Sequence, residues 1–143
     1  MVKDILDGIS IKLNQVFGSS YEIYGDTDVV QGLETPCFFI AVLQPSQNQM
    51  IGKRYFRQYP FDIHYFPSNE GDNVECLEVA DDLLEALELI TLTNGDVLRG
   101  TSMNYEIVDK VLHFKVNFNL FVLKEETVDA METVEIDSNV PIS

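Results

Sequence analysis

The sequence predicts an α+β fold in two layers, with an antiparallel or mixed sheet of four to five strands packed against two amphipathic helices. Three observations support this prediction. Two segments repeat their apolar residues at the helical period, several segments alternate apolar and polar residues as strands do, and one seven-residue run is wholly apolar. At 143 residues, the chain has the length of one domain with a sizeable core.

The first helix is expected from Val2 to Phe17, where apolar residues recur every three or four positions. These positions are Val2, Ile5, Leu6, Ile9, Leu13, Val16 and Phe17. Gly18 ends the helix. A short strand is predicted at Tyr21–Tyr24, and the acidic segment from Gly25 to Thr35 is predicted to be a loop.

Two strong strands follow. The apolar run Cys37–Leu43 is typical of a strand buried on both faces. The aromatic run from Arg54 to Pro67 alternates, and its inward face is expected to hold Tyr55, Arg57, Tyr59, Phe61, Ile63 and Tyr65. We expect a helix, the chain's own tail or another subunit to cover the opposite face, at Phe56, Asp62, His64 and Phe66. Pro60 cannot donate a ladder hydrogen bond, so it predicts an edge position or a bulge.

The segment Gln44–Lys53 between these strands is polar and longer than a tight turn requires. Loops of this length often contact something. We therefore expect it to be an irregular arm that contacts a partner.

The second helix is expected from about Asp72 to Leu89, with Asp72 as its N-cap and Glu75 as the reciprocal partner of a capping box. Its core side is predicted to hold Cys76, Leu77, Ala80, Leu83, Leu84 and Leu87. Acidic residues occupy the opposite side, which is typical of a solvated face or of a contact with a basic neighbour.

A hairpin is expected next, with arms at Thr101–Val108 and Val111–Lys124 and a two-residue turn at Asp109 and Lys110. The second arm has a regular apolar face, which sets its register. This face holds Leu112, Phe114, Val116, Phe118, Leu120 and Val122.

The α+β domain is predicted to comprise residues 1–124, and residues 125–143 are predicted to form an acidic tail. The tail holds acids, no base and no sustained apolar period, so it has little to bury by itself. Two interpretations stay open, a disordered solvating tail and an arm that docks on a partner.

Charge, cysteines and hydropathy narrow the function classes. A formal net charge of −15 disfavours gripping a nucleic-acid backbone, although an acidic wall suits a channel through which DNA slides. Cys37 and Cys76 have no CxxC spacing, so both are expected to be reduced core thiols. We expect no signal peptide, and the sequence has no apolar run long enough to span a bilayer. We expect the protein to stay in the cytosol where it is made, or in a particle assembled there.

Catalytic motifs are not found. The sequence has no HExxH, no GxSxG elbow and no phosphate-binding glycine loop. Asp62, His64 and His113 could form a site of two histidines and one carboxylate if their strands pair side by side. Polar residues on an outer sheet face are expected without a metal, so we predict no metal, no cofactor and no enzymatic activity. A metal-dependent enzyme using these three residues is the alternative from a different class.

The candidate contacts with partners are the arginines, the polar segment Gln44–Lys53 and the acidic tail, residues 125–143. Arg54, Arg57 and Arg99 could pair with carboxylates of another copy, or form salt bridges within the chain. The predicted interface set is Gln47, Asn48, Gln49, Met50, Ile51, Arg54, Phe56, Arg57, His64, Arg99, Met131, Val134 and Ile136.

The strings QGLETPCFF, RYFRQYPFDIHYF and LRGTSMNYEIVDKVLHF occur in this order. With them, the chain from Val2 to about Glu125 resembles the small tail terminator proteins of tailed phages and prophages of Gram-positive bacteria. The resemblance implies a non-enzymatic virion protein that caps the head-proximal end of the tail tube as a hexameric ring, ends tube polymerisation and meets the neck. A neck or head–tail connector protein one layer higher is the alternative.

The implied partners are further copies of the chain, the tail tube protein, a neck or connector protein and, in a contractile tail, the sheath protein. DNA would pass through the lumen without specific binding, and no membrane is involved. The resemblance also implies assembly in the cytoplasm of the host bacterium. It carries over no catalytic residue.

Overall fold

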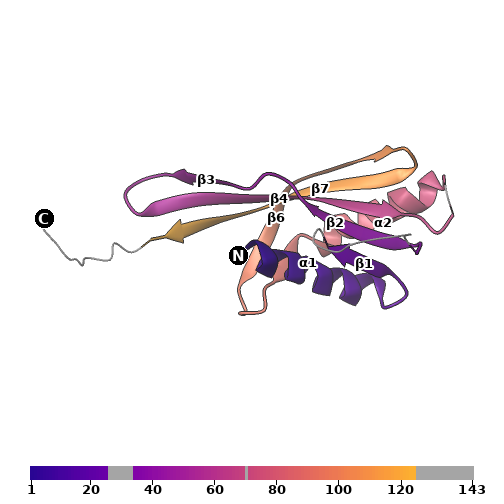
Figure 1. Ribbon diagram of the computed structural model, residues 1–143, viewed down its shortest axis with the longest axis horizontal. Coiled ribbons are helices and arrows are strands. Elements are labelled where there is room, and N and C mark those ends of the chain that lie inside the picture. Colours follow the sequence, from indigo (N-terminus) through magenta and orange to yellow (C-terminus); the bar gives the residue numbers. More distant parts are fainter. Residues whose placement is uncertain (26–33, 70, 125–143) are drawn as a thin grey trace, which may run out of the picture. The chain divides into compact units, whose positions relative to one another are not determined.

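The computed structural model describes residues 1–25, 34–69 and 71–124, and it has the α+β fold that the sequence predicts (Figure 1). Its elements are α1 (Val2–Phe17), β1 (Glu22–Gly25), β2 (Cys37–Val42), β3 (Ser46–Gln49), β4 (Arg54–Phe66), α2 (Asn73–Ala86), β5 (Leu89–Thr91), β6 (Val97–Val108) and β7 (Val111–Leu123). The strand order is β1-β2-β4-β7-β6-β5, with β3 also paired to β4. The sheet is mixed, because β1 runs parallel to β2 whereas β2 and β4 are antiparallel.

The sheet contains seven strands, not four to five. The two unexpected strands are β3, which lies in the polar segment predicted to be irregular, and β5, which has only three residues. Neither has the repeated apolar alternation from which a strand is predicted, so only main-chain pairing with a neighbour makes them strands.

The chain divides into two compact units. Among the described residues, the first unit contains 1–25, 34–46, 57–69 and 71–120, and the second contains 47–56 and 121–124. The predicted tail, residues 125–143, and most of the predicted loop before residue 34 lie outside the described residues.

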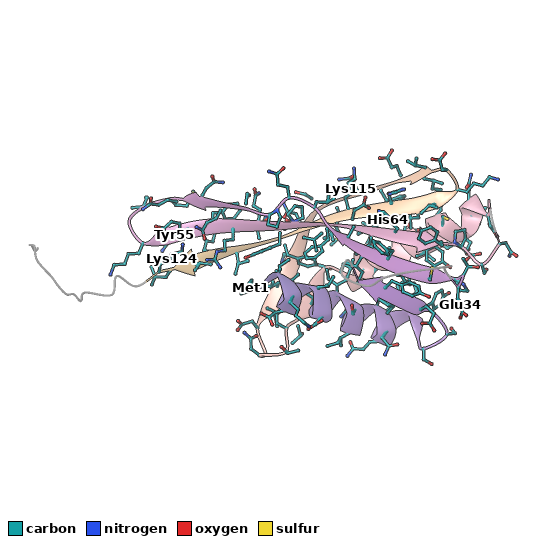
Figure 2. The ribbon with its side chains drawn as sticks, in the orientation of Figure 1. Met1, Glu34, Tyr55, His64, Lys115 and Lys124 are labelled. Carbon is teal, nitrogen blue, oxygen red and sulfur yellow. The ribbon has the colours of Figure 1, made fainter. Side chains whose placement is uncertain are left out.

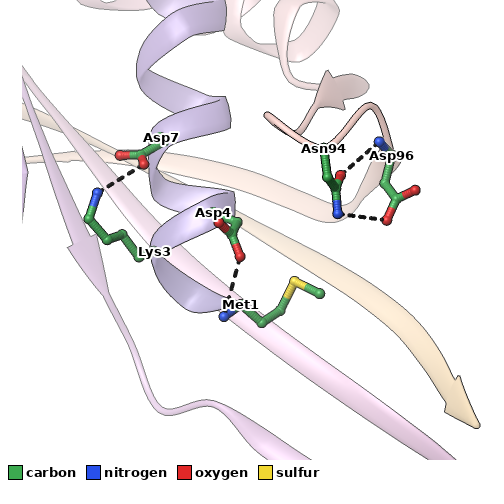
Figure 3. A network of polar contacts seen from close by, with 6 residues as sticks. All are labelled: Met1, Lys3, Asp4, Asp7, Asn94 and Asp96. Atoms are coloured by element: carbon green, nitrogen blue, oxygen red, sulfur yellow. Dashed lines mark hydrogen bonds and ion pairs between the residues drawn. The ribbon is translucent and has the colours of Figure 1, made fainter.

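Helix α1 has the predicted bounds, and its buried stripe is Ile5, Ile9 and Leu13. The expected core positions Val2 and Val16 are exposed, because they lie in the first and last turns of the helix. Figure 3 shows polar contacts at the start of α1, where Lys3 Nζ lies 3.0 Å from Asp7 Oδ2. The same figure shows the turn before β6.

In that turn Asn94 Oδ1 accepts a hydrogen bond of 2.9 Å from the backbone N–H of Asp96. This contact is the Asx-type turn that Asn followed by Gly favours.

Helix α2 starts at the predicted cap, where Asp72 Oδ1 accepts a hydrogen bond of 3.0 Å from the backbone N–H of Glu75. It ends at Ala86, three residues earlier than predicted, because Leu89 already belongs to β5. Leu77 and Leu84 were expected in the core and are exposed. The side that faces the sheet instead holds Cys76, Val79, Ala80, Leu83 and Ala86.

Glu75 is not the reciprocal partner of the capping box. Its carboxylate accepts hydrogen bonds from the Tyr65 hydroxyl, from the Ser68 hydroxyl at 2.9 Å and from the Ser68 backbone N–H at 2.8 Å. Burial opposes the charged form of Glu75, but these hydrogen bonds outweigh it and lower the pKa of Glu75. Burial and the Glu75 carboxylate together raise the pKa of Tyr65. Glu75 therefore connects the start of α2 to the end of β4.

Replacing Glu75 by glutamine is expected to reduce the free energy of unfolding by about 1–2 kcal/mol near pH 7, because charge-assisted hydrogen bonds become neutral ones. The lowered pKa of the folded state makes the stabilisation by the carboxylate present above the ordinary pKa of a glutamate. It is lost as the pH falls through the lowered value. Denaturant unfolding of both proteins from pH 7 to pH 3 tests this. A stability difference that stays the same across that range contradicts the assignment.

Strand β4 lies between other strands, so Pro60 does not mark a sheet edge. The backbone N–H of Leu43 donates a 2.9 Å hydrogen bond to the carbonyl oxygen of Pro60, immediately after β2 ends at Val42. Strand β3 begins only at Ser46. Because the nitrogen and oxygen of a strand residue point to the same neighbour, the missing N–H of Pro60 faces the gap between β2 and β3.

The core lies on one face of the sheet. Buried side chains of α1, α2 and β5 form one cluster with those of β2, β4 and β7. Phe61, Ile63 and Tyr65 contribute the inward face of β4 as predicted, and Leu112, Phe114, Val116 and Phe118 contribute that of β7. Strand β2 is not buried on both faces throughout, since Phe39 and Ala41 are partly exposed.

Both cysteines are buried free thiols, as predicted. Burial, aided by the negative charge of Glu22, raises the pKa of Cys37 to about 11. Burial also raises the pKa of Cys76. Both residues therefore stay protonated at neutral pH.

The β6–β7 hairpin turns at Asp109 and Lys110, as predicted. Their φ angles are 51° and 66°, so both residues adopt the left-handed backbone conformation that a two-residue turn of type I′ requires. The ladder shifts register between Thr101 and Asn104, where Ser102 also has a positive φ of 53°. Such a shift marks a β-bulge.

Candidate functional site

Three ionisable side chains meet on the face of the sheet opposite to the core: Asp62 and His64 of β4, and His113 of β7. Figure 2 labels His64. Asp62 and His64 are two residues apart in one strand, so their side chains leave the same face. Their neighbours Phe61 and Ile63 point to the other face and are buried. Strand β7 is the neighbour of β4 in the sheet, which brings His113 beside them.

Both imidazoles direct a nitrogen at the same carboxylate oxygen. His64 Nε2 lies 3.2 Å from Asp62 Oδ2, and His113 Nδ1 lies 3.4 Å from it. The two imidazole rings are 4.3 Å apart between centroids and meet at 60°. Phe39, which is paired with His64 across the β2–β4 ladder, packs on the other side of that ring at 5.9 Å.

Asp62 is the one buried charged residue in the described part of the chain, with 8% of its surface exposed. Its second oxygen, Oδ1, is buried and has no hydrogen-bond partner among the described residues. Leaving such an oxygen unpaired costs free energy, which a cation or a hydrogen-bond donor at the site can recover.

This arrangement fulfils the condition that the sequence left open. A site of two histidines and one carboxylate requires the strands of Asp62 and His113 to lie side by side, and in the structure they do. Imidazole nitrogens and a carboxylate can hold a metal ion or share a proton.

The second unit contains the segment that the sequence marks as a contact with partners. The prediction that this segment is irregular was wrong, because Ser46–Gln49 forms β3 and pairs with β4. The side chains of β3 are exposed, as the polar residues Gln47, Asn48 and Gln49 suggest. The turn after them is closed by two hydrogen bonds of 2.8 Å, from the Met50 N–H to the Arg54 oxygen and from Gln49 Nε2 to the Gly52 oxygen.

Large apolar side chains are exposed on this unit. Ile51 is 86% exposed, Met50 54%, Phe121 63% and Leu123 72%. We call these four residues the exposed apolar group. Phe56 packs against the Phe121 ring at 5.0 Å and is half-buried.

The two chain segments of this unit are joined near Lys124. The backbone N–H of Lys124 donates a 3.0 Å hydrogen bond to the Lys53 oxygen. Its ammonium group lies over the Tyr55 ring, 4.2 Å from the centroid, and Figure 2 shows the two residues side by side. The two chain segments that contain the exposed apolar group are therefore held together by a main-chain hydrogen bond.

The other predicted interface residues are dispersed. Arg54 is exposed at the start of β4, and Arg57 is half-buried. Arg99 forms an ion pair of 3.0 Å with Glu88, which is the salt bridge within the chain that the sequence left as an alternative. The predicted contacts Met131, Val134 and Ile136 lie outside the described residues.

Sequence reasoning missed Phe121 and Leu123 as exposed apolar residues. A signal was present, because Phe121 continues the row of His113, Lys115, Asn117 and Asn119 on the polar face of β7. An aromatic residue on a polar face is a reason to expect a partner.

No helix in the described part of the chain is long and apolar enough to cross a membrane. A comparison with protein families matches residues 4–130 to a family described as phage tail terminator protein. A search of curated proteins finds no match.

Proposed function

Because the chain belongs to the phage tail terminator protein family and is thus a structural component of a phage tail, we propose that it caps the head-proximal end of the tail tube as a ring. In this role it ends tube polymerisation and forms the surface to which the neck attaches. The ring is built from copies of this chain, with six as the expected number. Its neighbours are the tail tube protein on one side, a neck or connector protein on the other and, in a contractile tail, the sheath protein.

The observation that carries this proposal is the exposed apolar group of the second unit. Ile51, Met50, Phe121 and Leu123 belong to two segments that a hydrogen bond between Lys124 and Lys53 joins. Several large apolar side chains exposed on one compact unit are a reason to expect a protein partner. A closed ring needs an interface in which one face of a subunit binds a different face of the next. The exposed apolar group supplies one of these two faces.

The negative charge of the chain supports its placement at the wall of a channel for DNA. The exposed side of α2 carries Glu78, Asp81, Asp82 and Glu85, and the chain has a formal net charge of −15. An acidic wall repels the phosphates of passing DNA and does not retain it. The role requires no catalytic residue, so we propose that the protein is not an enzyme and is assembled into the tail in the cytoplasm of the host.

Replacing Ile51 by aspartate is expected to weaken ring formation at least about 30-fold, because a charge in the apolar centre of an interface costs about 2 kcal/mol or more. The side chain of Ile51 is exposed in the single chain, so the fold should be unchanged. Native mass spectrometry and negative-stain microscopy measure the rings, and circular dichroism checks the fold. This substitution is a cleaner test than deleting residues 47–51, because the deletion would also remove most of β3.

The matched control is Val74→Asp, which places the same charge at another exposed apolar residue, on α2. Its rings should form as in the wild type. Wild-type assembly of the Ile51→Asp variant would contradict the role of the exposed apolar group. Depleting the protein during phage growth separates a terminator from a connector, because loss of a terminator gives tails of abnormal length, whereas loss of a connector gives normal tails without heads.

A further inference from the structure

We propose that Asp62, His64 and His113 form a binding site for one divalent transition-metal ion of the zinc class. The ion would link strand β4 to strand β7. The chain contains only two histidines, and both direct a ring nitrogen at the same oxygen of one buried carboxylate. This site shares no residue with the exposed apolar group, so its test does not depend on ring formation.

The spacing of the ligand atoms fits a tetrahedral ion. With metal–ligand bonds of about 2.0–2.1 Å, two ligands of a tetrahedral zinc ion lie about 3.3–3.4 Å apart. The observed separations from Asp62 Oδ2 are 3.2 Å to His64 Nε2 and 3.4 Å to His113 Nδ1. All three ligand atoms lie within 4.8 Å of one another. Both imidazoles are partly exposed, so a small rotation of the rings can bring the two nitrogens to the same spacing.

The buried carboxylate supplies the second, independent observation. Asp62 is 8% exposed, and its Oδ1 has no hydrogen-bond partner among the described residues. In that part of the chain its ion-pair partners are the two imidazoles, which carry a charge only when protonated. A cation bound beside this carboxylate offsets the cost of burying it with one oxygen unpaired.

The donor set selects the class of ion. Two imidazole nitrogens and one carboxylate oxygen suit zinc, cobalt, nickel and copper, whereas magnesium and calcium prefer sites made of oxygen ligands only. Three protein ligands leave the fourth position of a tetrahedral ion open to water. Since β4 and β7 are neighbours in the sheet but distant in the sequence, an ion held by both stabilises their pairing.

The test uses the full chain without a histidine tag, freed of metal by a chelator and titrated with Zn²⁺ and Co²⁺ at pH 7.5. Calorimetry should give one Zn²⁺ per chain. Saturating Zn²⁺ should raise Tm by about 5–10 °C at a hundredfold excess over Kd. Co²⁺ should give the visible bands of a four-coordinate ion without the thiolate bands that Cys37 or Cys76 would add.

His64→Gln and His113→Gln should each weaken Zn²⁺ binding by about 100-fold or more, since each removes one of three ligands. The control Asp82→Asn removes one exposed acid from α2 and should bind Zn²⁺ as the wild type does. Because many exposed acids attract divalent cations, Mg²⁺ in excess should be present throughout and should not displace Zn²⁺.

Binding weaker than about 100 µM overturns the proposal, as does binding that both histidine variants retain or Co²⁺ spectra with thiolate bands. Should a variant fail to fold, the imidazole NMR signals of the wild type decide. Both histidines must shift together with one equivalent of Zn²⁺, and unchanged signals overturn the proposal.

Discussion

Replacing Gly100 by alanine is expected to lower the free energy of unfolding by about 3 kcal/mol or more. A Cβ atom added at Gly100 would lie 2.2 Å from the carbonyl oxygen of Leu87 and 2.8 Å from Cε of Met103. The Leu87 oxygen is backbone, so it cannot move away as a flexible side chain can. The Gly100 N–H also donates a 2.9 Å hydrogen bond to the Glu88 oxygen, so movement of the strand would lengthen that bond. Urea unfolding followed by circular dichroism measures the loss.

The matched control is Gly8→Ala, the same substitution at a buried glycine of α1. There the nearest atoms to an added Cβ lie at 3.3 Å, and alanine favours the helix by about 1 kcal/mol. The cost of the tight contacts and the gain in helix propensity should nearly cancel, so the free energy of unfolding should hardly change. An equal stability for Gly100→Ala and the wild type would mean that the close approach of β6 to Leu87 does not exist in solution.

Replacing Phe38 by alanine is expected to cost about 3–5 kcal/mol. Phe38 is fully buried, and its ring packs against those of Phe17 and Tyr65 at 5.0 Å and of Tyr21 at 5.7 Å. Truncation leaves a cavity between α1, β2 and β4. It also removes aromatic contacts that are each worth about 0.5–1.5 kcal/mol.

The control for Phe38 is its neighbour Phe39, which lies on the other face of β2 and is partly exposed. Phe39→Ala should cost only about 1 kcal/mol, because little apolar surface is removed from the core. Thermal and urea unfolding of the two variants measure the difference. Similar losses would show that the core does not lie on the face of the sheet to which Phe38 belongs.

Local patterns correctly predicted the bounds of α1, the start of α2 and the turn of the hairpin. The apolar period and Gly18 give α1 its bounds, and Asp72 starts α2 through a contact only three residues away, at the Glu75 N–H. The turn at Asp109 and Lys110 was predicted from the two runs that flank it. These features depend on residues close in the sequence, where period, caps and turns act.

The errors have a common physical cause. All side chains of β3 are polar, so no apolar alternation predicts a strand there. It is a strand because its main chain pairs with β4. Leu77 and Leu84 fit the helical period of α2, but the side of the helix that the sheet covers decides which apolar residues are buried. The second role of Glu75 depends on Tyr65, which lies in another element.

The candidate metal site was predictable only in part. Period two placed Asp62 and His64 on one face, but His113 is 51 positions away from Asp62 in the sequence. Whether they meet depends on β7 being the neighbour of β4, and no local pattern specifies that order. The exposed apolar group is similar, because Ile51 and Phe121 come from segments distant in the sequence.

The sequence by itself determined the α+β class, the bounds of α1, the buried inward residues of the second half of β4 and the first part of β7, and membership of the phage tail terminator family, which the match over residues 4–130 confirms. Only the tertiary structure decided the strand order, the pairing of β3 and β5 and the meeting of Asp62 with His113. The physical reason is that helix periods and turns are stabilised by neighbours in the sequence. Strand order and clustered side chains instead depend on pairing and burial between segments that are far apart along the chain.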